Sequence, residues 1–243
     1  MTDMPMSVII ITLNEEKTLG RLMGDLKQQT AKNFEVIVVD SNSEDRTVAV
    51  AMEHGADFSE FSVVEMDNRG TSLGRNTGAE NAKYEHLVFL DADSRVDVDF
   101  IEKAQTVMKK AGLKVAGGRM KTNNSDTLIR LGIKSFDWGM VLTQYVFPTA
   151  VGACIFSTKT VHQEIGGFDT RISLCEDCDY VKRASKTHKF RMIPVFFEFD
   201  TRRLTEQGVI KTGFTYLKAN LYRMMFGEMT KNQIPYEFGQ HGQ

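Results

Sequence analysis

The chain has few cysteines, and they do not form the pattern of a metal-binding domain. Its 243 residues contain three, Cys154, Cys175 and Cys178. The last two form a Cys-x-x-Cys pair, but neither a second such pair nor a histidine cluster completes a tetrahedral zinc site. We therefore expect reduced thiols, as in a cytosolic protein.

An excess of charge of one sign and a long apolar run are also absent. Thirty basic side chains face 32 acidic ones, a formal charge of −2, so the overall balance favours neither nucleic acid nor anionic lipid as a partner. The apolar run at residues 8–11 is short, and no basic segment precedes it. It is too short for a signal peptide or a membrane span, so we expect a protein that is made and kept in the cytoplasm.

The common glycine-rich nucleotide motifs are missing as well. Gly70 and residues 74–78, Gly-Arg-Asn-Thr-Gly, match neither the GxGxxG fingerprint nor the Walker A pattern. This argues against a dehydrogenase or a P-loop enzyme. With 42% hydrophobic and 26% charged residues, the chain is expected to form a single ordered α/β domain with an appendage.

Strand and helix patterns alternate through the first half of the chain. Apolar, β-branched runs without polar alternation predict buried strands, and apolar residues three and four apart predict helices between them. Strands are expected at residues 7–13, 34–40, 61–65 and 85–91, and helices at 15–27, 47–54, 72–82 and 100–111. This order is typical of a doubly wound, mostly parallel sheet, which binds ligands beyond the carboxyl ends of its strands.

The regular alternation ends near residue 118, where a different half begins. Strands are expected at residues 115–120, 150–157 and 190–199, and helices at 128–146, 177–187 and 208–226. The segment at residues 162–169 is expected to give a short helix that ends in glycines.

Two carboxylates follow the strand expected at residues 85–91. Asp91 and Asp93 come directly after a buried run, where a carboxylate is costly without a cation or partner. Oxygen ligands of this kind suit Mg²⁺ or Mn²⁺, and such an ion would offset the charge that develops on a departing diphosphate. A solvated turn is the alternative, since a lone Asp-x-Asp is common.

Other polar residues lie at the same expected edge of the sheet. Asp40 either accepts hydrogen bonds from a base or ribose or caps the loop that follows it. Thr12, Asn14 and Glu15 close the first strand, where helix capping explains Asn14 nearly as well as ligand contact. The guanidinium of Arg75 pairs with phosphate or with the Asp91 region, or it is exposed.

Three carboxylates crowd the start of the helix expected at residues 177–187. Glu176, Asp177 and Asp179 follow a Gly-Gly-Phe-Asp segment at residues 166–169. One of them could take a proton from an acceptor hydroxyl. For Glu176 and Asp179, the alternative is that they cap the N-terminus of the helix. Past the next strand, the paired Arg202 and Arg203 either clasp a diphosphate or are solvated.

Taken in order, five segments resemble the successive motifs of glycosyltransferase family 2. They lie at residues 8–16, 36–47, 70–82, 89–93 and 166–183, and the resemblance spans roughly residues 6–205. It implies a GT-A fold, a nucleotide-diphospho-sugar donor with a divalent cation, and inversion of the anomeric centre in one displacement. It also divides the chain into a GT-A domain at residues 1–205, with a nucleotide-binding half at 1–117 and an acceptor-side half at 118–205, and a C-terminal helical extension at 206–243.

On the nucleotide side, the resemblance assigns a role to each candidate residue. Thr12, Asn14 and Glu15 match the first nucleotide-contacting stretch of the family. Asp40 matches the carboxylate that reads the base, and Arg75 matches a basic residue of the donor site.

On the reaction side, the resemblance implies a metal and a general base. Asp93 is expected to ligate Mn²⁺ or Mg²⁺ directly, with Asp91 as a ribose or metal partner. Asp177 matches the catalytic base that deprotonates the acceptor hydroxyl, while the metal and Arg202 or Arg203 hold the leaving diphosphate.

The chain also departs from the longer, processive family members. These carry a Gln-x-x-Arg-Trp motif and membrane spans, and neither appears here, so the chain resembles small soluble members whose acceptors are mostly unassigned. Residues 121–149 and the tail are expected to select the acceptor. The segment at residues 216–226 mixes basic, aromatic and apolar side chains, and it either packs against the domain or rests on a membrane near a lipid-linked acceptor.

Two other functions remain as alternatives. A sugar-1-phosphate nucleotidylyltransferase has a similar nucleotide fold, but its glycine-rich, basic N-terminal signature is missing here. A non-catalytic nucleotide-sugar binding module would have no need of the set formed by Asp91, Asp93 and Asp177.

Overall fold

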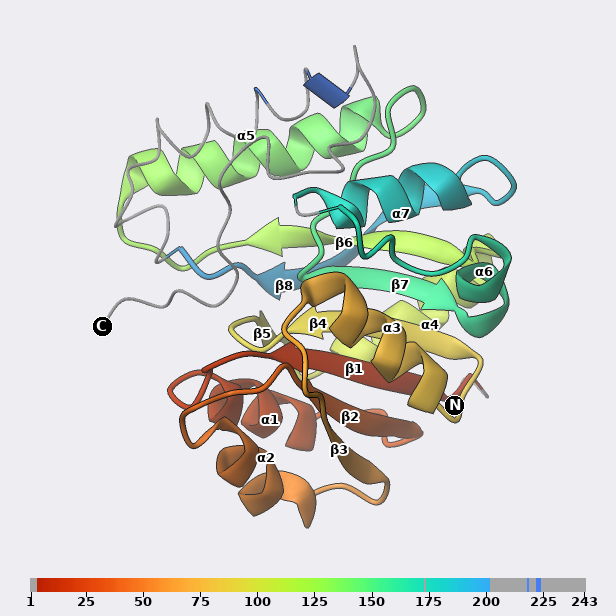
Figure 1. Cartoon of the computed structure of the whole chain (residues 1–243). Helices are drawn as coiled ribbons and strands as arrows, with labels where there is room; N and C mark the ends of the chain where they lie inside the picture. Colours follow the sequence, from red (N-terminus) through yellow and green to blue (C-terminus); the bar gives the residue numbers. More distant parts are fainter. Residues whose placement is uncertain (1–3, 173, 202–217, 219–221, 224–243) are drawn as a thin grey trace.

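The structure is a computed structural model that describes residues 4–172, 174–201, 218 and 222–223. In this part of the chain, eight strands form one sheet in the order β3-β2-β1-β4-β7-β6-β8-β5 (Figure 1). The sheet runs without a break through both halves of the sequence, so residues far apart along the chain meet at its edges.

The first half forms the parallel part of this sheet. Strand β1 pairs in parallel with β2 and with β4, and β2 pairs in parallel with β3. All residues of β1 and β2 are buried, which explains why neither strand shows polar alternation. The elements are β1 (Met6–Thr12), α1 (Leu19–Lys27), β2 (Phe34–Asp40), α2 (Thr47–Gly55), β3 (Phe61–Glu65), α3 (Thr71–Asn81) and β4 (His86–Asp91).

The second half continues the same sheet with mixed strand directions. Strand β7 is antiparallel to both β4 and β6, β8 is parallel to β6, and β5 is antiparallel to β8 at the edge. The elements are β5 (Arg95–Val96), α4 (Phe100–Ala111), β6 (Val115–Lys121), α5 (Thr127–Thr143), β7 (Cys154–Thr158), α6 (Lys159–Glu164), α7 (Glu176–Ala184) and β8 (Phe190–Glu198). The predicted doubly wound, mostly parallel α/β sheet is confirmed.

Several predicted boundaries were wrong. Helix α1 begins at Leu19, because residues 15–18 form a turn in which the carbonyl oxygen of Glu15 accepts from the N–H groups of Thr18 and Leu19. Glu15 is therefore outside the first helical turn. Strand β7 begins at Cys154 rather than at residue 150, and α6 begins at Lys159, three residues earlier than expected. As expected, the helix ends where the glycines follow, since Gly166 and Gly167 both have positive φ.

The structure also differs from the prediction at the end of α5 and at β5. Helix α5 ends at Thr143, three residues earlier than expected, and the two-residue β5 was not predicted. The helix expected at residues 208–226 lies outside the described residues except for positions 218, 222 and 223. Within the described ranges, no helix has the length and hydropathy needed to cross a bilayer.

Helix α3 packs unusually close to the sheet because it presents glycines to it. A Cβ atom at Gly78 would lie 2.3 Å from Ile9 of β1, and one at Gly74 would lie 3.2 Å from Ile11. Larger residues at these positions would push the helix away. The close approach brings Arg75, on the next position of α3, to the carboxyl edge of β1 and β4.

Candidate active site

A buried arginine lies at the centre of the site. The side chain of Arg75 is only 2% exposed, and its Nη2 donates to Oδ1 of Asp91 at 3.0 Å. Its Nη1 donates to Oε1 of Glu176 at 2.7 Å, and the guanidinium lies 5.3 Å from the centre of the Phe168 ring. Asp91 ends β4 and Glu176 begins α7, so one side chain links the end of a central strand to the start of a helix from the second half of the chain.

Asp177 lies beside the same guanidinium. Its Oδ2 accepts from the backbone N–H of Gly152 at 2.7 Å, and its Oδ1 accepts from the N–H of Cys178 at 2.7 Å. Gly152 in turn touches Arg75, because a Cβ atom there would lie 2.5 Å from Nη2 of the arginine. The structure therefore brings Asp91 and Asp177, 86 positions apart in the sequence, around one cation.

Carboxyl groups outnumber cations in this cluster. Burial raises the pKa of the Asp91 carboxyl, Arg75 opposes this, and Asp177 and Glu15 add to it. Burial also raises the pKa of Glu176, with Asp177 adding to the effect and Arg75 opposing it. Burial by itself lowers the pKa of Arg75, but the surrounding carboxylates raise it above its ordinary value. Three carboxyl groups thus surround one guanidinium, which stays charged.

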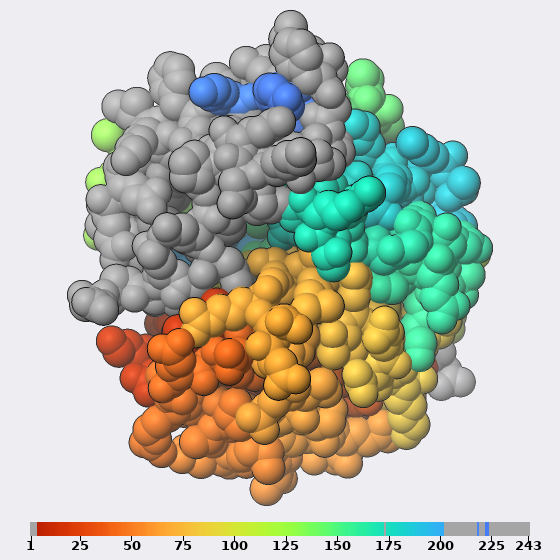
Figure 2. Space-filling view, viewed as in Figure 1, coloured from red at the N-terminus to blue at the C-terminus, as the bar shows by residue number. Residues whose placement is uncertain are grey.

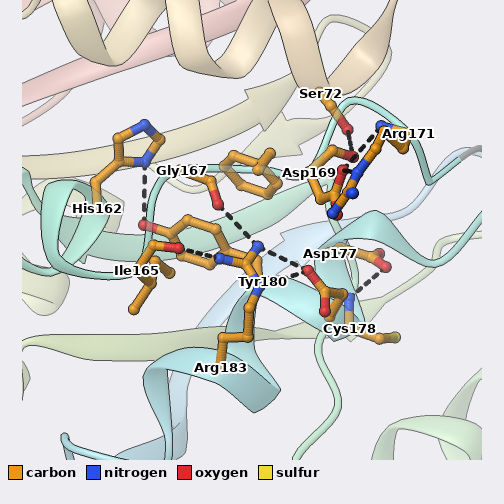
Figure 3. Close-up of polar contacts among 12 residues, drawn as sticks. Ser72, His162, Ile165, Gly167, Asp169, Arg171, Asp177, Cys178, Tyr180 and Arg183 are labelled. Carbon is orange, nitrogen blue, oxygen red and sulfur yellow. Dashed lines mark hydrogen bonds and ion pairs between the residues drawn. The ribbon is translucent and has the colours of Figure 1, made fainter. Parts of the chain in front are cut away.

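The loop before α7 is held firmly against α3. The side chain of Asn76 accepts from the N–H of Phe168 at 2.8 Å and donates to its carbonyl oxygen at 2.9 Å. From α7, Arg183 donates to the carbonyl oxygens of Ile165 and Gly167 (Figure 3). In the space-filling view, the orange surface around α3 meets the green-to-teal segment that leads into α7 (Figure 2). These contacts fix the start of α7 relative to Arg75.

At the carboxyl ends of β1 and β2, the Asp40 carboxylate organises the loop after β2. Its Oδ1 accepts from the hydroxyls of Thr12 at 2.9 Å and Ser43 at 2.6 Å, and its Oδ2 accepts from the N–H of Ser43 at 2.8 Å. A carboxylate has about four acceptor sites, so Asp40 keeps roughly one for a further donor. The hydroxyl of Thr12 is used within the protein and positions Asp40.

Asn14 and Glu15 connect the ends of β1 and β2. Asn14 adopts the left-handed conformation, with φ of 57°, and its Oδ1 accepts from the N–H of Glu44 at 2.8 Å. The N–H of Glu15 donates to the Thr47 hydroxyl at 2.7 Å, and the Glu15 carboxylate accepts from the Thr18 hydroxyl. These bonds hold the loop that borders the Asp91 region.

Two carboxylates at the end of β4 offer oxygen ligands of the kind that suit a divalent ion. Asp91 and the half-buried Asp93 flank the turn there, and the carbonyl oxygen of Asp91 accepts from the N–H of Ser94 at 3.1 Å. Across the described residues, no group of three or more His, Cys, Asp or Glu side chains is placed to hold a metal ion. Magnesium at phosphate sites is commonly held by one or two carboxylates together with phosphate and water oxygens, and this pair fits that arrangement.

The structure separates the predicted site residues into three groups. It brings together Asp91, Arg75 and Asp177, and it places the β1 and β2 residues at the same sheet edge. Arg202 and Arg203 lie outside the described residues. Two contributors were missed: the role of Glu176 as a partner of Arg75, and the N–H group of Gly152. The only sequence signal for the role of Glu176 was its position beside Asp177. The Gly152 contact left no signal, because a backbone N–H group is present at nearly every residue.

The sequence matches a known family. The model described as Glycosyl transferase family 2 matches residues 7–166, which include the ends of β1, β2 and β4, α3 and the start of the Gly-Gly-Phe-Asp loop. The chain therefore belongs to glycosyltransferase family 2. The resemblance inferred from the five segments is confirmed.

Curated relatives are longer than this chain. Glycosyltransferase AglE of Haloferax volcanii is 25% identical over 186 residues, which cover 74% of this chain and 60% of that protein. Cholesterol galactosyltransferase of Borreliella burgdorferi is 29% identical over 120 residues, covering 49% of this chain and 30% of that protein.

Solved structures share the fold. The mannosyltransferase PcManGT of Pyrobaculum calidifontis, in complex with GDP-Man and Mn²⁺, matches with a TM-score of 0.70 and 19% identity, over 90% of this chain and 61% of that one. TarS of S. aureus (residues 1–349) matches with a TM-score of 0.68 and 19% identity, over 82% of this chain and 61% of that one. The predicted GT-A fold is confirmed.

Proposed function

We propose that this protein transfers a sugar from a nucleotide-diphospho-sugar to a hydroxyl acceptor, with a divalent metal and with inversion of the anomeric centre. The observation that carries the proposal is the cluster around Arg75, in which a carboxylate from the donor-side strand and one from α7 lie at the same guanidinium. A reaction between two substrates requires groups from both sides at one point.

The charge of the cluster supports metal dependence. Asp91, Glu176 and Asp177 surround a single cation, so an incoming diphosphate would meet net negative charge. A divalent ion reverses this local balance. Asp91 and Asp93 would hold Mn²⁺ or Mg²⁺, which would neutralise the diphosphate as it departs. Arg202 and Arg203, outside the described residues, are proposed to add positive charge there.

Asp177 is proposed as the general base. Its two known bonds come from backbone N–H groups, which orient the carboxylate and leave it acceptor sites for a hydroxyl proton. The acceptor oxygen forms a bond to the anomeric carbon, the bond from that carbon to the phosphate oxygen breaks, and the acceptor proton moves to Asp177. Because one displacement occurs at the carbon, its configuration inverts.

The nucleotide end is proposed to bind the base and ribose. Asp40 keeps an acceptor site for the base, while Thr12, Asn14 and Glu15 shape the loops that border it. The hydrogen bonds of Arg75 go to Asp91 and Glu176. Arg75 acts on the donor through the position of Asp91.

The substrates are proposed by class. The matched structures include TarS with UDP and with UDP-GlcNAc and the mannosyltransferase with GDP-Man. A uridine or guanosine diphosphate sugar is therefore the donor class to test first. The acceptor is proposed to be lipid-linked, reached by a protein that works in the cytoplasm with peripheral membrane contact at the inner face. The segment at residues 216–226, to which that contact was assigned, lies largely outside the described residues.

The test separates binding from chemistry. Purified protein is screened by thermal shift against nucleotide-diphospho-sugars with Mn²⁺, and the release of nucleoside diphosphate by transfer to water serves as the assay. Asp177→Asn should bind donor like the parent but release product about 10²–10⁴ times more slowly. Asp93→Ala should lose the Mn²⁺ dependence of donor binding.

A matched control is Asp99→Asn, at the N-terminus of α4, which should behave like the parent in both assays. Equal turnover by Asp177→Asn and the parent would remove Asp177 as the base. Release of pyrophosphate from a nucleoside triphosphate and a sugar phosphate would favour the nucleotidylyltransferase alternative.

A further inference from the structure

Helix α5 has apolar side chains on two opposite faces. Ile129, Ile133 and Met140 are buried on the side that packs against β6 and β8. On the other side lies a row that we name the α5 stripe: Leu128, Leu131, Trp138, Leu142 and Tyr145, which are 72%, 59%, 47%, 73% and 68% exposed. The spacing of the first four, three, seven and four positions apart, puts them on one line along the helix, and Tyr145 extends this line into the turn that follows α5.

Such a row is unusual on a surface that faces only water. A helix of this length extends roughly 25 Å, and Val146, 91% exposed, continues the row past its end. Exposed apolar patches of this kind mark surfaces that bind a partner or a membrane. Figure 1 shows α5 beyond β6, on the opposite side of the molecule from α1 and α2.

The charges beside the α5 stripe are basic. Arg130 and Lys134 are exposed on α5. The one acidic residue within the helix, Asp137, is buried and bonded to Arg119 at 2.6 Å, so it does not offset them. The exposed N-cap, Asp126, places one carboxylate at the start of the helix, where it accepts from the N–H of Leu128. The chain as a whole carries a formal charge of −2, so this basic character is local.

A pocket at the C-terminal end of the α5 stripe adds to the positive charge. Tyr145 and Val146 line it together with His188, Lys189 and Arg191, and it encloses about 410 Å³. The Arg191 guanidinium lies 4.4 Å from the centre of the Tyr145 ring. The Glu164 carboxylate bonds to Nε2 of His188 at 2.5 Å, so Lys189 and Arg191 supply the positive charge of the pocket.

We propose that the α5 stripe is a docking surface for an anionic membrane, with the helix in the plane of the interface and the pocket at its end facing lipid phosphates. Leucine and tryptophan on one face with lysine and arginine beside them is the composition of interfacial helices, and an aromatic ring suits the boundary between lipid and water. A second copy of the chain fits less well, since a two-fold contact through this face would bring like charges together.

The test is flotation of the full-length protein with vesicles, without donor or acceptor, so its result does not depend on the proposed transfer reaction. Binding is expected to vesicles of phosphatidylcholine with about 25% phosphatidylglycerol and to weaken when salt rises from about 0.1 to 0.5 M. Leu131→Glu and Leu142→Glu should each lower the partition coefficient at least about tenfold. Lys134→Glu should lower it less, and only for the anionic vesicles.

Matched controls use exposed residues on other elements. Met52→Glu on α2, at a side chain 61% exposed, and Lys110→Glu on α4 should leave partitioning within about twofold of the parent. Thermal melts of all variants should coincide, which excludes unfolding as the cause. Partitioning of Leu142→Glu equal to the parent would overturn the proposal. So would a parent dimer in light scattering that Leu142→Glu dissociates, because a second copy would then be the occupant.

Discussion

Replacing Arg75 by methionine tests the centre of the site, because it removes the charge while keeping a side chain of similar length. Two carboxylates, Asp91 and Glu176, then lose their partner. Breaking a fully buried ion pair costs about 3–5 kcal/mol. The side chains of Asp91 and Glu176 are 35% and 15% exposed, and solvent screens part of this loss. We expect Arg75→Met to lower the free energy of unfolding by about 2–4 kcal/mol.

The loss should depend on pH in a definite direction. Burial already raises the pKa of both carboxyls in the folded state, and Arg75 opposes that rise, so its removal raises both pKa values further. A carboxyl whose pKa is higher in the folded state than in the unfolded state destabilises the fold as pH rises through the folded-state pKa. The deficit of Arg75→Met should therefore be largest at about pH 8 and smaller at about pH 5.

Urea denaturation followed by the fluorescence of the single tryptophan measures this directly. Arg75→Lys should show a smaller loss, since an ammonium keeps the charge but not the two-pronged geometry. Arg171→Met is the matched control: that side chain is 78% exposed and pairs with Asp169, so it should cost less than about 1 kcal/mol. A deficit of Arg75→Met that is the same at both pH values would refute the reasoning.

Two glycine substitutions test close approaches elsewhere. Gly152→Ala would place a methyl group 2.5 Å from Nη2 of Arg75, so donor turnover should fall at least about tenfold, whereas Gly139→Ala, with open space around it, should turn over like the parent. Gly78→Ala would place a methyl group 2.3 Å from a β1 side chain and should lower the free energy of unfolding by about 1–3 kcal/mol, whereas Gly24→Ala, also in open space, should be neutral or slightly stabilising. Turnover by Gly152→Ala equal to that of the parent would contradict the packing described around Arg75. An unfolding midpoint of Gly78→Ala equal to that of the parent would contradict the packing of α3 on β1.

Most of the fold could be predicted because its central strands are buried on both faces. Short, β-branched apolar runs such as residues 36–39 of β2 are typical of interior strands of a covered sheet, and the boundaries of β2 and β4 were predicted to within a residue. The start of α1 was missed because the turn at residues 15–18 is held by backbone bonds to Glu15 and by contacts to the loop after β2. Those contacts are long-range and leave no local signal.

The site was harder to predict because it also depends on contacts between residues far apart in the sequence. That Asp91 and Asp177 lie at strand and helix ends follows from the pattern, but their meeting depends on the antiparallel return of β7 beside β4. The burial of Arg75 depends on the glycines of α3, which in the sequence matched neither the GxGxxG nor the Walker A motif and predicted no close packing. Sequence reasoning left its partner open between phosphate and the Asp91 region, and the structure pairs it with Asp91 and Glu176.

A crystal structure with bound donor sugar nucleotide and Mn²⁺ is the most direct test of the proposed mechanism. It should show the ion within about 2.2 Å of an oxygen of Asp93 or Asp91 and of the diphosphate, with the Asp177 carboxylate facing the anomeric carbon from the side opposite the leaving phosphate. An ion bound elsewhere, or Asp177 turned away from the sugar, would contradict it.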